Sequence, residues 1–138
     1  MKTINVTVVS AEKELYAGVV TFFAATAVTG EIGVYPGHVP TLAQLKAGQV
    51  RLTLQDGKEE VIWISGGLLE IQPQEIIVLA DSAERAKDLD AAAVEKARAE
   101  AKAVLESGAK SDLDIEKALI ELSLAKSQLD AVNRLKSF

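Results

Sequence analysis

The residues that could do chemistry gather in one short stretch, residues 30–40, which holds the only histidine, His38, together with Glu31. An acid and a base in one segment is the pairing that general acid–base catalysis uses, and the hydroxyls of Tyr35 and Thr41 are close in sequence. Catalysis also needs an activated nucleophile or an electrophilic stabiliser at the same point, and nothing in the sequence marks either hydroxyl as activated. The sequence therefore predicts no catalytic residue. A stand-alone enzyme that uses His38 is kept as an alternative, but the sequence suggests no reaction for it.

The same stretch is conformationally constrained. Three glycines tolerate positive φ, and two prolines fix φ and remove hydrogen-bond donors. It lacks the Gly-Lys-Ser/Thr ending of a phosphate-binding loop, as does the Gly66-Gly67 pair further on. We therefore expect residues 30–40 to form a rigid docking loop at a surface, and Gly66-Gly67 to permit a tight crossing between strands.

Composition excludes several other kinds of site. The 138 residues carry a net charge of −5, and they include one histidine and no cysteine. Disulfides and thiolate metal sites are thereby excluded, and no metal site or cofactor is predicted. Neither part of the chain has the basic face that a phosphate backbone requires, so nucleic-acid binding is not predicted. No apolar run approaches the roughly 20 residues that span a bilayer, and the N-terminus predicts no signal or transit peptide. We expect a protein of a bacterial cytoplasm.

Two segments with different periodicity must position these residues. Residues 1–85 show alternating runs over 4–9 and 50–65, with a hairpin signal at Asp56-Gly57, and further strands over 19–28, 68–72 and 76–80. Gly66-Gly67 and Pro73 are expected to separate strands, and Trp63 is expected in the core. Short strands at this spacing predict an N-terminal β-sandwich or flattened barrel.

Residues 86–138 change to helical periodicity. A first helix is predicted over residues 89–106, capped by Asp88 or Asp90 and ended at Gly108. Its apolar face has only small residues and valines. A second helix is predicted over residues 113–136, and the short connection makes the pair an antiparallel hairpin. The faces predicted to be buried are Val94, Ala97, Ala101 and Val104 in the first helix, and Ile115, Ala118, Leu119, Leu122, Ala125, Leu129, Val132 and Lys136 in the second.

The alanine-rich face has an energetic consequence for docking of the hairpin. Burial of a leucine side chain contributes roughly 1.5–3 kcal/mol, whereas alanine contributes about one methyl group. A hairpin held by alanines is only marginally fixed, and it is suited to switching between two arrangements. The alternative is a hairpin that permanently caps the sandwich.

Four motifs together resemble the epsilon subunit of bacterial F-type ATP synthases. They are GEIGVYPGHVP at residues 30–40, ISGGLLEIQP at 64–73, VLADSA at 78–83 and VVSAE at 8–12. Their order and spacing, and the plan of a β domain followed by helices, agree with that family over nearly the whole chain. The resemblance implies a ten-stranded β-sandwich over residues 1–85 and a regulatory helical hairpin over 86–138.

The resemblance also implies partners and a location. A family member of this kind is a non-catalytic rotor subunit of the central stalk that couples proton transport to ATP synthesis, at the cytoplasmic face of the bacterial inner membrane. It reaches the membrane only through the complex. The gamma subunit and the c-subunit ring are the implied partners of the sandwich, and the alpha and beta subunits those of an extended hairpin that blocks ATP hydrolysis. The implied partner-binding residues are Ser10, Glu31, Gly33, Tyr35, Gly37 and His38.

Some members of that family bind ATP on the folded hairpin through a motif of the form Ile/Leu-Asp-x-x-Arg-Ala. The matching stretch here begins with Leu89-Asp90, but Ala93 stands at the arginine position. Glu84 matches another position of that site, but a carboxylate cannot supply the cation that phosphate prefers. An ATP-sensing switch protein is therefore the alternative interpretation, with Glu84 and Asp90 as its nucleotide-binding residues.

Overall fold

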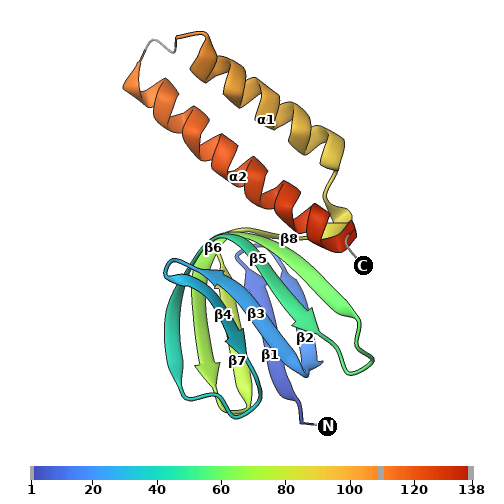
Figure 1. The fold of residues 1–138 in the computed structure, drawn as a ribbon. Helices are drawn as coiled ribbons and strands as arrows, with labels where there is room; N and C mark the ends of the chain where they lie inside the picture. Colours follow the sequence, from blue (N-terminus) through green and yellow to red (C-terminus); the bar gives the residue numbers. More distant parts are fainter. Residues whose placement is uncertain (1, 109–110, 137–138) are drawn as a thin grey trace.

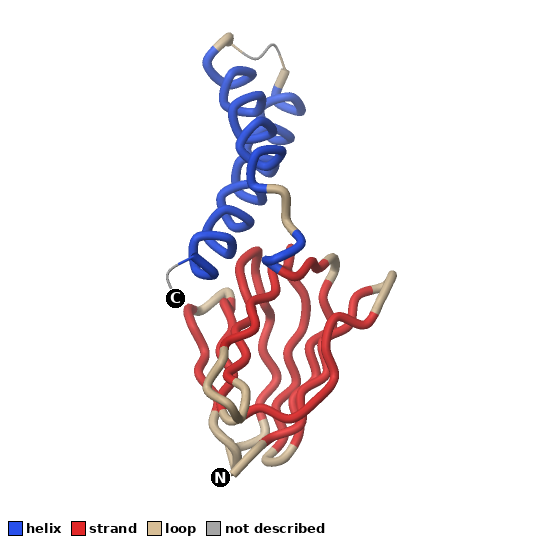
Figure 2. The backbone as a smooth tube through the Cα atoms, turned by 90° about the vertical axis from the view of Figure 1, so that its right-hand side faces the viewer, coloured by secondary structure: helices blue, strands red, loops and turns tan. Residues whose placement is uncertain are grey.

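The computed structural model describes residues 2–108 and 111–136, and Figure 1 shows a β domain with a helical hairpin standing on one end of it. Figure 2 places the N-terminus at the opposite end of the β domain. The elements in chain order are β1 (Ile4–Ser10), β2 (Glu14–Val20), β3 (Phe22–Ala27), β4 (Gly30–Val34), β5 (Thr41–Thr53), β6 (Glu59–Gln72), β7 (Glu75–Ala80), β8 (Ala83–Arg85), a short 3₁₀ helix η1 (Ala86–Asp88), α1 (Ala91–Glu106) and α2 (Asp112–Lys136).

The strands form one hydrogen-bonded sheet that folds into two layers. The sheet order is β2-β1-β7-β6-β5-β3-β4, and β8 pairs with β6 off this path. The strand β6 changes partner along its length, since residues 62–64 pair with β8 and residues 67–72 pair with β7. The first layer therefore contains β2, β1, β7 and the adjoining halves of β6 and β5. The second layer contains β8, the other halves of β6 and β5, β3 and β4 (Figure 1).

The count of ten strands expected from the resemblance is wrong, because the described chain has eight. The sequence places a break at Gly66-Gly67, but β6 runs through both residues without ending. Gly66 and Gly67 have φ of 143° and 151°, which lets the strand bend sharply while its pairing with β5 continues. The strand β5 is irregular opposite this point, because its register with β3 shifts between Val50 and Leu45. Each long strand thus serves both layers, and a sandwich is formed with fewer strands.

Other strand predictions are partly corrected. The run over residues 19–28 is interrupted at Thr21, so that β2 ends and β3 begins within it. The hairpin at Asp56-Gly57 is confirmed in place, but only Gly57 has positive φ, so the type I′ turn is wrong. Pro73 lies in the turn between β6 and β7, as predicted.

The core lies between the two layers. Side chains at alternate strand positions point inward, and the largest fully buried ones are Phe23, Ile4, Leu52, Ile62, Ile64, Leu69, Ile71, Ile76, Val6, Val8, Val20 and Val34. Gly67 pairs with Ala80 of β7, and an added Cβ at Gly67 would be 2.2 Å from the carbonyl oxygen of Leu79. The close approach predicted for the glycine pair is found at Gly67, but the two strands are paired neighbours and do not cross.

The helices begin and end close to the predicted residues. Asp90 caps α1, since its Oδ1 accepts hydrogen bonds from the backbone N–H groups of Ala92 and Ala93. Gly108 follows α1 with φ of 76°. Ser111 caps α2 through its Oγ and the N–H of Asp114. Residues 109 and 110 of the predicted connection lie outside the described residues. No helix in the described ranges is long and apolar enough to cross a membrane.

Fewer residues of the two helices are buried than the helical periodicity predicts. Val94 and Ala101 of α1 are buried against α2, whereas Ala97 and Val104 are exposed. In α2, Ala118, Ala125 and Val132 are buried, and Leu122 and Leu129 are half-buried. Ile115 and Leu119 are exposed, because the N-terminal half of α2 extends beyond the β domain (Figure 1).

Candidate functional site

The outer face of the first layer carries an apolar patch. Val9 of β1, Leu79 of β7 and Leu68 of β6 lie next to one another in register across three strands. Two further outward-facing residues belong to the same face: Leu42 of β5 and Ile77 of β7 lie on either side of Glu70 of β6. We call Val9, Leu42, Leu68, Ile77 and Leu79 the first-layer patch. Its three leucines are all exposed, which is unusual for contiguous large apolar side chains and typical of a protein interface.

Ser10 and His38 lie at opposite ends of the first layer. Ser10 ends β1 beside Ala80, near the hairpin end, and its Oγ accepts the backbone N–H of Glu12 at 3.4 Å. His38 belongs to the loop that leads into β5, at the other end. The first-layer patch lies between them. The sequence identified both ends of this face but not the patch, although the adjacent pair Leu68-Leu69 in one strand signalled that a leucine must face outward.

Only the second half of the predicted docking loop is a loop. Residues 30–34 form strand β4 at the edge of the sheet, so the loop proper is residues 35–40. Gly37, with φ of 90°, donates its N–H to the carbonyl oxygen of Pro73 at 2.7 Å. The His38 Nδ1 lies 2.7 Å from the carbonyl oxygen of Val39. His38 thus has a local backbone partner, and its ring is available at the surface rather than paired with Glu31.

Glu31, Gly33 and Tyr35 lie on the second layer instead. Glu31 forms an ion pair with Arg51 of β5 at 2.7 Å. The Tyr35 ring packs on Phe22 with centroids 4.7 Å apart. A Cβ at Gly33 would lie 3.1 Å from that phenylalanine ring. The structure therefore divides the six predicted partner residues between two faces, and Glu31 and His38 do not converge as an acid–base pair.

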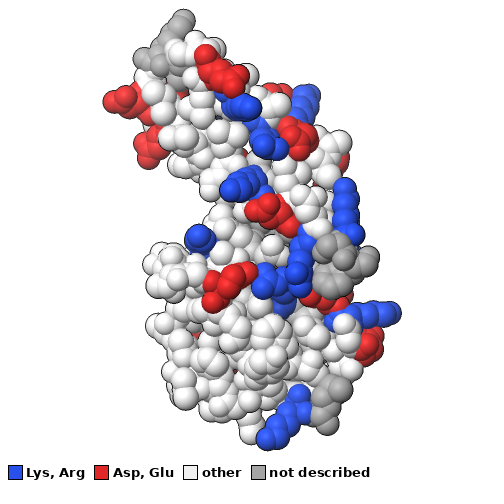
Figure 3. All heavy atoms as spheres, in the orientation of Figure 1, with Lys and Arg blue, Asp and Glu red and all other residues white. Residues whose placement is uncertain are grey.

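The hairpin docks on the second layer through α2. A second buried stripe of α2, which the sequence prediction missed, meets the outward side of β6. The small cluster between them contains Val61, Trp63, Ala86 and Ala131, packed by Leu89, Leu124 and Leu135. Trp63 is buried as predicted, but under α2 rather than in the core between the layers. Figure 3 shows charged side chains of both signs along the hairpin and at this junction, while the part of the sandwich farther from the hairpin is mostly uncharged in that view.

Among the described residues, polar contacts from Trp63 and Glu59 join the sandwich to the hairpin. The indole Nε1 of Trp63 donates to the Oγ of Ser127 at 2.8 Å. The guanidinium of Arg134 donates to both carboxylate oxygens of Glu59, at 2.8 and 2.9 Å. This hydrogen bonding to Glu59 raises the pKa of Arg134, and the nearby charge of Glu31 adds to the effect.

The chain is anchored where it leaves the sandwich. Arg85, the last residue of β8, pairs with Glu60 at 3.4 Å and donates to the carbonyl oxygen of Leu15. Burial raises the pKa of the Tyr16 phenol, with Glu60 adding to the rise and Arg85 opposing it. The 3₁₀ turn η1 follows directly. This turn leads from the sandwich into α1.

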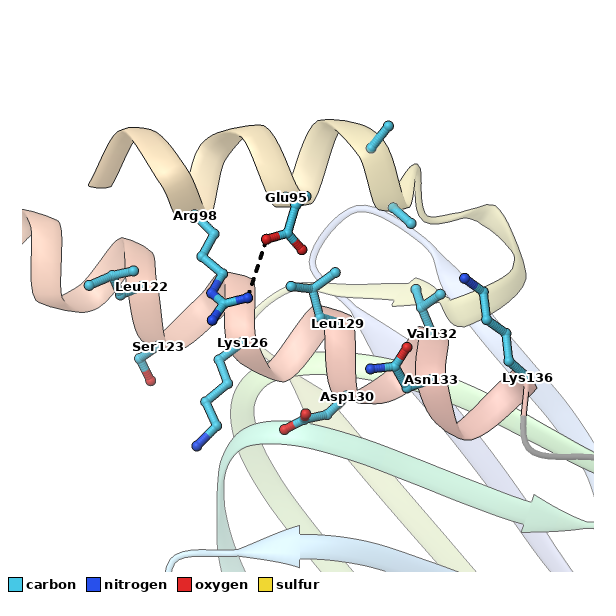
Figure 4. Close-up of a pocket in the computed structure, with 12 residues that line it drawn as sticks. Glu95, Arg98, Leu122, Ser123, Lys126, Leu129, Asp130, Val132, Asn133 and Lys136 are labelled. Carbon is cyan, nitrogen blue, oxygen red and sulfur yellow. Dashed lines mark hydrogen bonds and ion pairs between the residues drawn. The ribbon is translucent and has the colours of Figure 1, made fainter. Parts of the chain in front are cut away.

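A cleft of about 860 Å³ lies between the two helices (Figure 4). Leu129 and Val132 line its floor, and Arg98 reaches into it from α1 while paired with Glu95 at 3.2 Å. Lys136 points toward the start of α1, whereas Lys126 points away from it.

The residues that match the nucleotide motif are not in this cleft. Among the described residues, neither Glu84 nor Asp90 lines it. Glu84 pairs with Lys13 at 3.2 Å, and Asp90 is used as the cap of α1. No cluster of three or more His, Asp or Glu side chains in the described ranges could hold a metal ion.

Comparisons with known proteins give a family profile that covers the β domain and sequence relatives that cover nearly the whole chain. The profile of the family described as ATP synthase, Delta/Epsilon chain, beta-sandwich domain matches residues 3–86. The ATP synthase epsilon chain of Verminephrobacter eiseniae is 43% identical over 136 residues, with 99% of this chain and 98% of that protein covered. That of Acinetobacter baylyi is 42% identical over 137 residues, with the same coverage.

Solved structures share the fold. A chain in the cryo-EM structure of Euglena gracilis mitochondrial ATP synthase, OSCP/F1/c-ring, superimposes with a TM-score of 0.84 at 23% identity, covering 94% of this chain and 81% of that chain. A chain in the Tetrahymena thermophila mitochondrial ATP synthase central stalk and c-ring structure gives a TM-score of 0.61 at 13% identity, covering 95% and 97%. The sequence relatives settle the family: the chain belongs to the epsilon chains of ATP synthase, which are non-catalytic subunits of that complex.

Proposed function

We propose that this chain couples the c-subunit ring to the gamma subunit in the rotor of a bacterial ATP synthase and also regulates the complex. In this proposal residues 1–85 transmit torque during proton-driven ATP synthesis, and residues 86–138 act as a regulatory hairpin. The complex lies at the cytoplasmic face of the inner membrane, and this chain reaches the membrane only through its partners.

The first-layer patch is the observation that carries the coupling proposal. It offers exposed leucines on a flat, rigid sheet face, with Ser10 and His38 at its two ends, and it suits a protein partner that buries apolar area. We assign this face to gamma. Glu31, Gly33 and Tyr35 lie on the other layer, so we assign the edge strand β4 to the c-ring, and Gly37 to the rigid loop end between the two faces.

The docking of the hairpin supports its role as a regulator. It packs on the sandwich through α2, while α1 packs on α2 (Figure 2). The apolar cluster under α2 is small and contains two alanines, so the docked state has a modest advantage over a detached one. We propose that the docked hairpin permits turnover, and that the extended hairpin reaches the alpha and beta subunits and blocks ATP hydrolysis.

Substitution Leu79→Glu is expected to weaken binding of the isolated chain to purified gamma by at least about tenfold. The change places a charge in the first-layer patch and removes a leucine whose burial contributes roughly 1.5–3 kcal/mol. Titration calorimetry or surface plasmon resonance measures the affinity. Val28→Glu is the matched control, because Val28 and Leu79 are both 52% exposed and Val28 lies in the turn between β3 and β4. Equal affinities of the two variants would contradict the assignment of this face to gamma.

An ATP-sensing switch remains a second candidate because two cations line the cleft between the helices, Arg98 at one end and Lys136 at the other (Figure 4). The alternative predicts that isothermal titration calorimetry detects ATP binding that Arg98→Gln weakens. The alanine at position 93 and the ion pair between Glu95 and Arg98 favour the opposite result, which is no heat at millimolar ATP. Absence of heat would end this candidate and leave the coupling proposal untouched.

A further inference from the structure

The contact between Trp63 and Ser127 is a buried polar pair in apolar surroundings. Trp63 is 7% exposed and Ser127 is 8% exposed, and Val61 and Ala131 lie in the same cluster as the indole. The indole N–H has a single hydrogen to donate, and Ser127 Oγ accepts it at 2.8 Å. The Ser127 hydroxyl in turn donates to the carbonyl oxygen of Leu124 at 2.7 Å, within its own helix. While α2 stays docked, the indole N–H is satisfied only when the helix lies in this one position.

A displaced helix would leave the pair unsatisfied. If α2 slid along the sandwich while staying docked, the Trp63 N–H would be buried without a partner, which is unfavourable. If α2 left the sandwich, the indole N–H would instead bond to water. The pair therefore disfavours intermediate positions and makes docking close to a two-state process.

The second polar contact lies two helical turns further along the same face of α2. Arg134 holds Glu59 through both carboxylate oxygens, and the Glu59 side chain is only 12% exposed. A bidentate pair fixes orientation as well as distance. Seven residues separate Ser127 from Arg134, about 10 Å along the helix, so the two contacts together define both position and direction of α2.

The junction also contains a feature that favours release. Among the described side chains, Gln49 Oε1 is buried without a hydrogen-bond partner. Gln49 lines a cleft together with Ser123, Lys126 and Ser127 of α2. Departure of the helix would let this oxygen bond to water, which offsets part of the loss of the docked contacts.

We propose that Trp63–Ser127 and Glu59–Arg134 form a two-point latch that sets the fraction of docked hairpin. The latch stands on these contacts alone, and only its regulatory consequence rests on the proposed function. The buried hydrogen bond fixes the position of α2, and the ion pair clamps its C-terminal end. Both contacts are broken together when the hairpin detaches.

Trp63 is the only tryptophan, so its fluorescence reports the latch directly in the isolated full-length chain. Ser127→Ala removes the acceptor while favouring the helix itself, since alanine is the better helix former. We expect about a tenfold shift toward the detached hairpin, seen as red-shifted emission and faster quenching by acrylamide. Ser123→Ala is the matched control, because Ser123 is exposed one turn earlier on the same helix. For the ion pair, Arg134→Gln is compared with Arg98→Gln, whose partner Glu95 is exposed on α1.

Hydrogen exchange gives a second measurement that separates release from unfolding. With Ser127→Ala and Arg134→Gln, amides of residues 124–135 are expected to exchange faster while those of β5 and β6 stay protected. Emission, quenching and exchange equal to those of the two controls would overturn the latch. Loss of protection in the sandwich as well would also overturn it, because the contacts would then support the fold rather than docking. Neither measurement uses the ATP synthase complex, so failure of the latch is distinguishable from failure of the proposed function.

Discussion

Truncation after Asp88 is expected to raise ATP hydrolysis by the assembled ATP synthase several-fold without loss of the complex. The shortened chain lacks α1 and α2 and cannot extend into the alpha and beta subunits. It keeps β8, which pairs with β6, and Arg85, which pairs with Glu60. The sandwich and both of its proposed partner faces therefore remain. The ATPase rate of membranes that carry the truncated chain measures the effect, and the amount of gamma-bound chain checks assembly.

A locked hairpin is the matched control for that truncation. The chain contains no native cysteine, so Glu59→Cys with Arg134→Cys can be joined by a cleavable bifunctional reagent. These side chains are in contact when α2 is docked. The cross-linked complex is expected to hydrolyse ATP as fast as the truncated one, and cleavage of the link is expected to restore inhibition. A truncated complex no faster than the wild type would contradict the inhibitory role but not the coupling role.

Substitution Gly67→Ala is expected to have the largest effect on stability, a loss of about 4 kcal/mol in the free energy of unfolding. The Cβ would lie 2.2 Å from the carbonyl oxygen of Leu79 and 2.9 Å from the Cα of Ala80. These are backbone atoms of a paired strand and cannot move aside like the end of a side chain. A φ of 151° adds strain for any residue with a side chain. Since small domains are stable by only about 5–15 kcal/mol, this loss is severe.

Urea unfolding of the isolated chain measures that loss, with Gly57→Ala as its control. Gly57 also has positive φ, at 87°, but an added Cβ there meets nothing within 4 Å. Its substitution is expected to lower stability by only about 1–2 kcal/mol, the cost of the backbone conformation alone. If the two variants unfolded at the same urea concentration, the close approach of β6 to β7 would not be as tight as the structure has it.

Local chemistry made several features of this protein predictable from the sequence. Asp90 and Gly108 marked the two ends of α1, because capping and positive φ depend on a few neighbouring residues. The alternating runs identified the β domain, and the motifs at residues 30–40 and 64–73 identified the family. These signals are contained within single segments of the chain and need no contact between distant residues.

Prediction from the sequence failed where distant segments decide the outcome. The glycine pair in β6 looked like a break, but pairing with β5 carries the strand through the bend. The stretch over residues 30–34 looked like part of a loop, but β3 supplies the ladder that makes it an edge strand. The second buried stripe of α2 was missed because α2 packs on both α1 and the sandwich. A single helical period in the sequence identifies only one buried face.

The sequence by itself determined the family and the order of a β domain and two helices, and it predicted which residues contact partners. The tertiary structure decided how those residues are grouped. It put Ser10 and His38 at the two ends of an apolar patch and placed Glu31 on the other layer, paired with Arg51. The physical reason is that faces and junctions arise from register between strands and from the bend of β5 and β6, and register joins residues that are far apart in the chain.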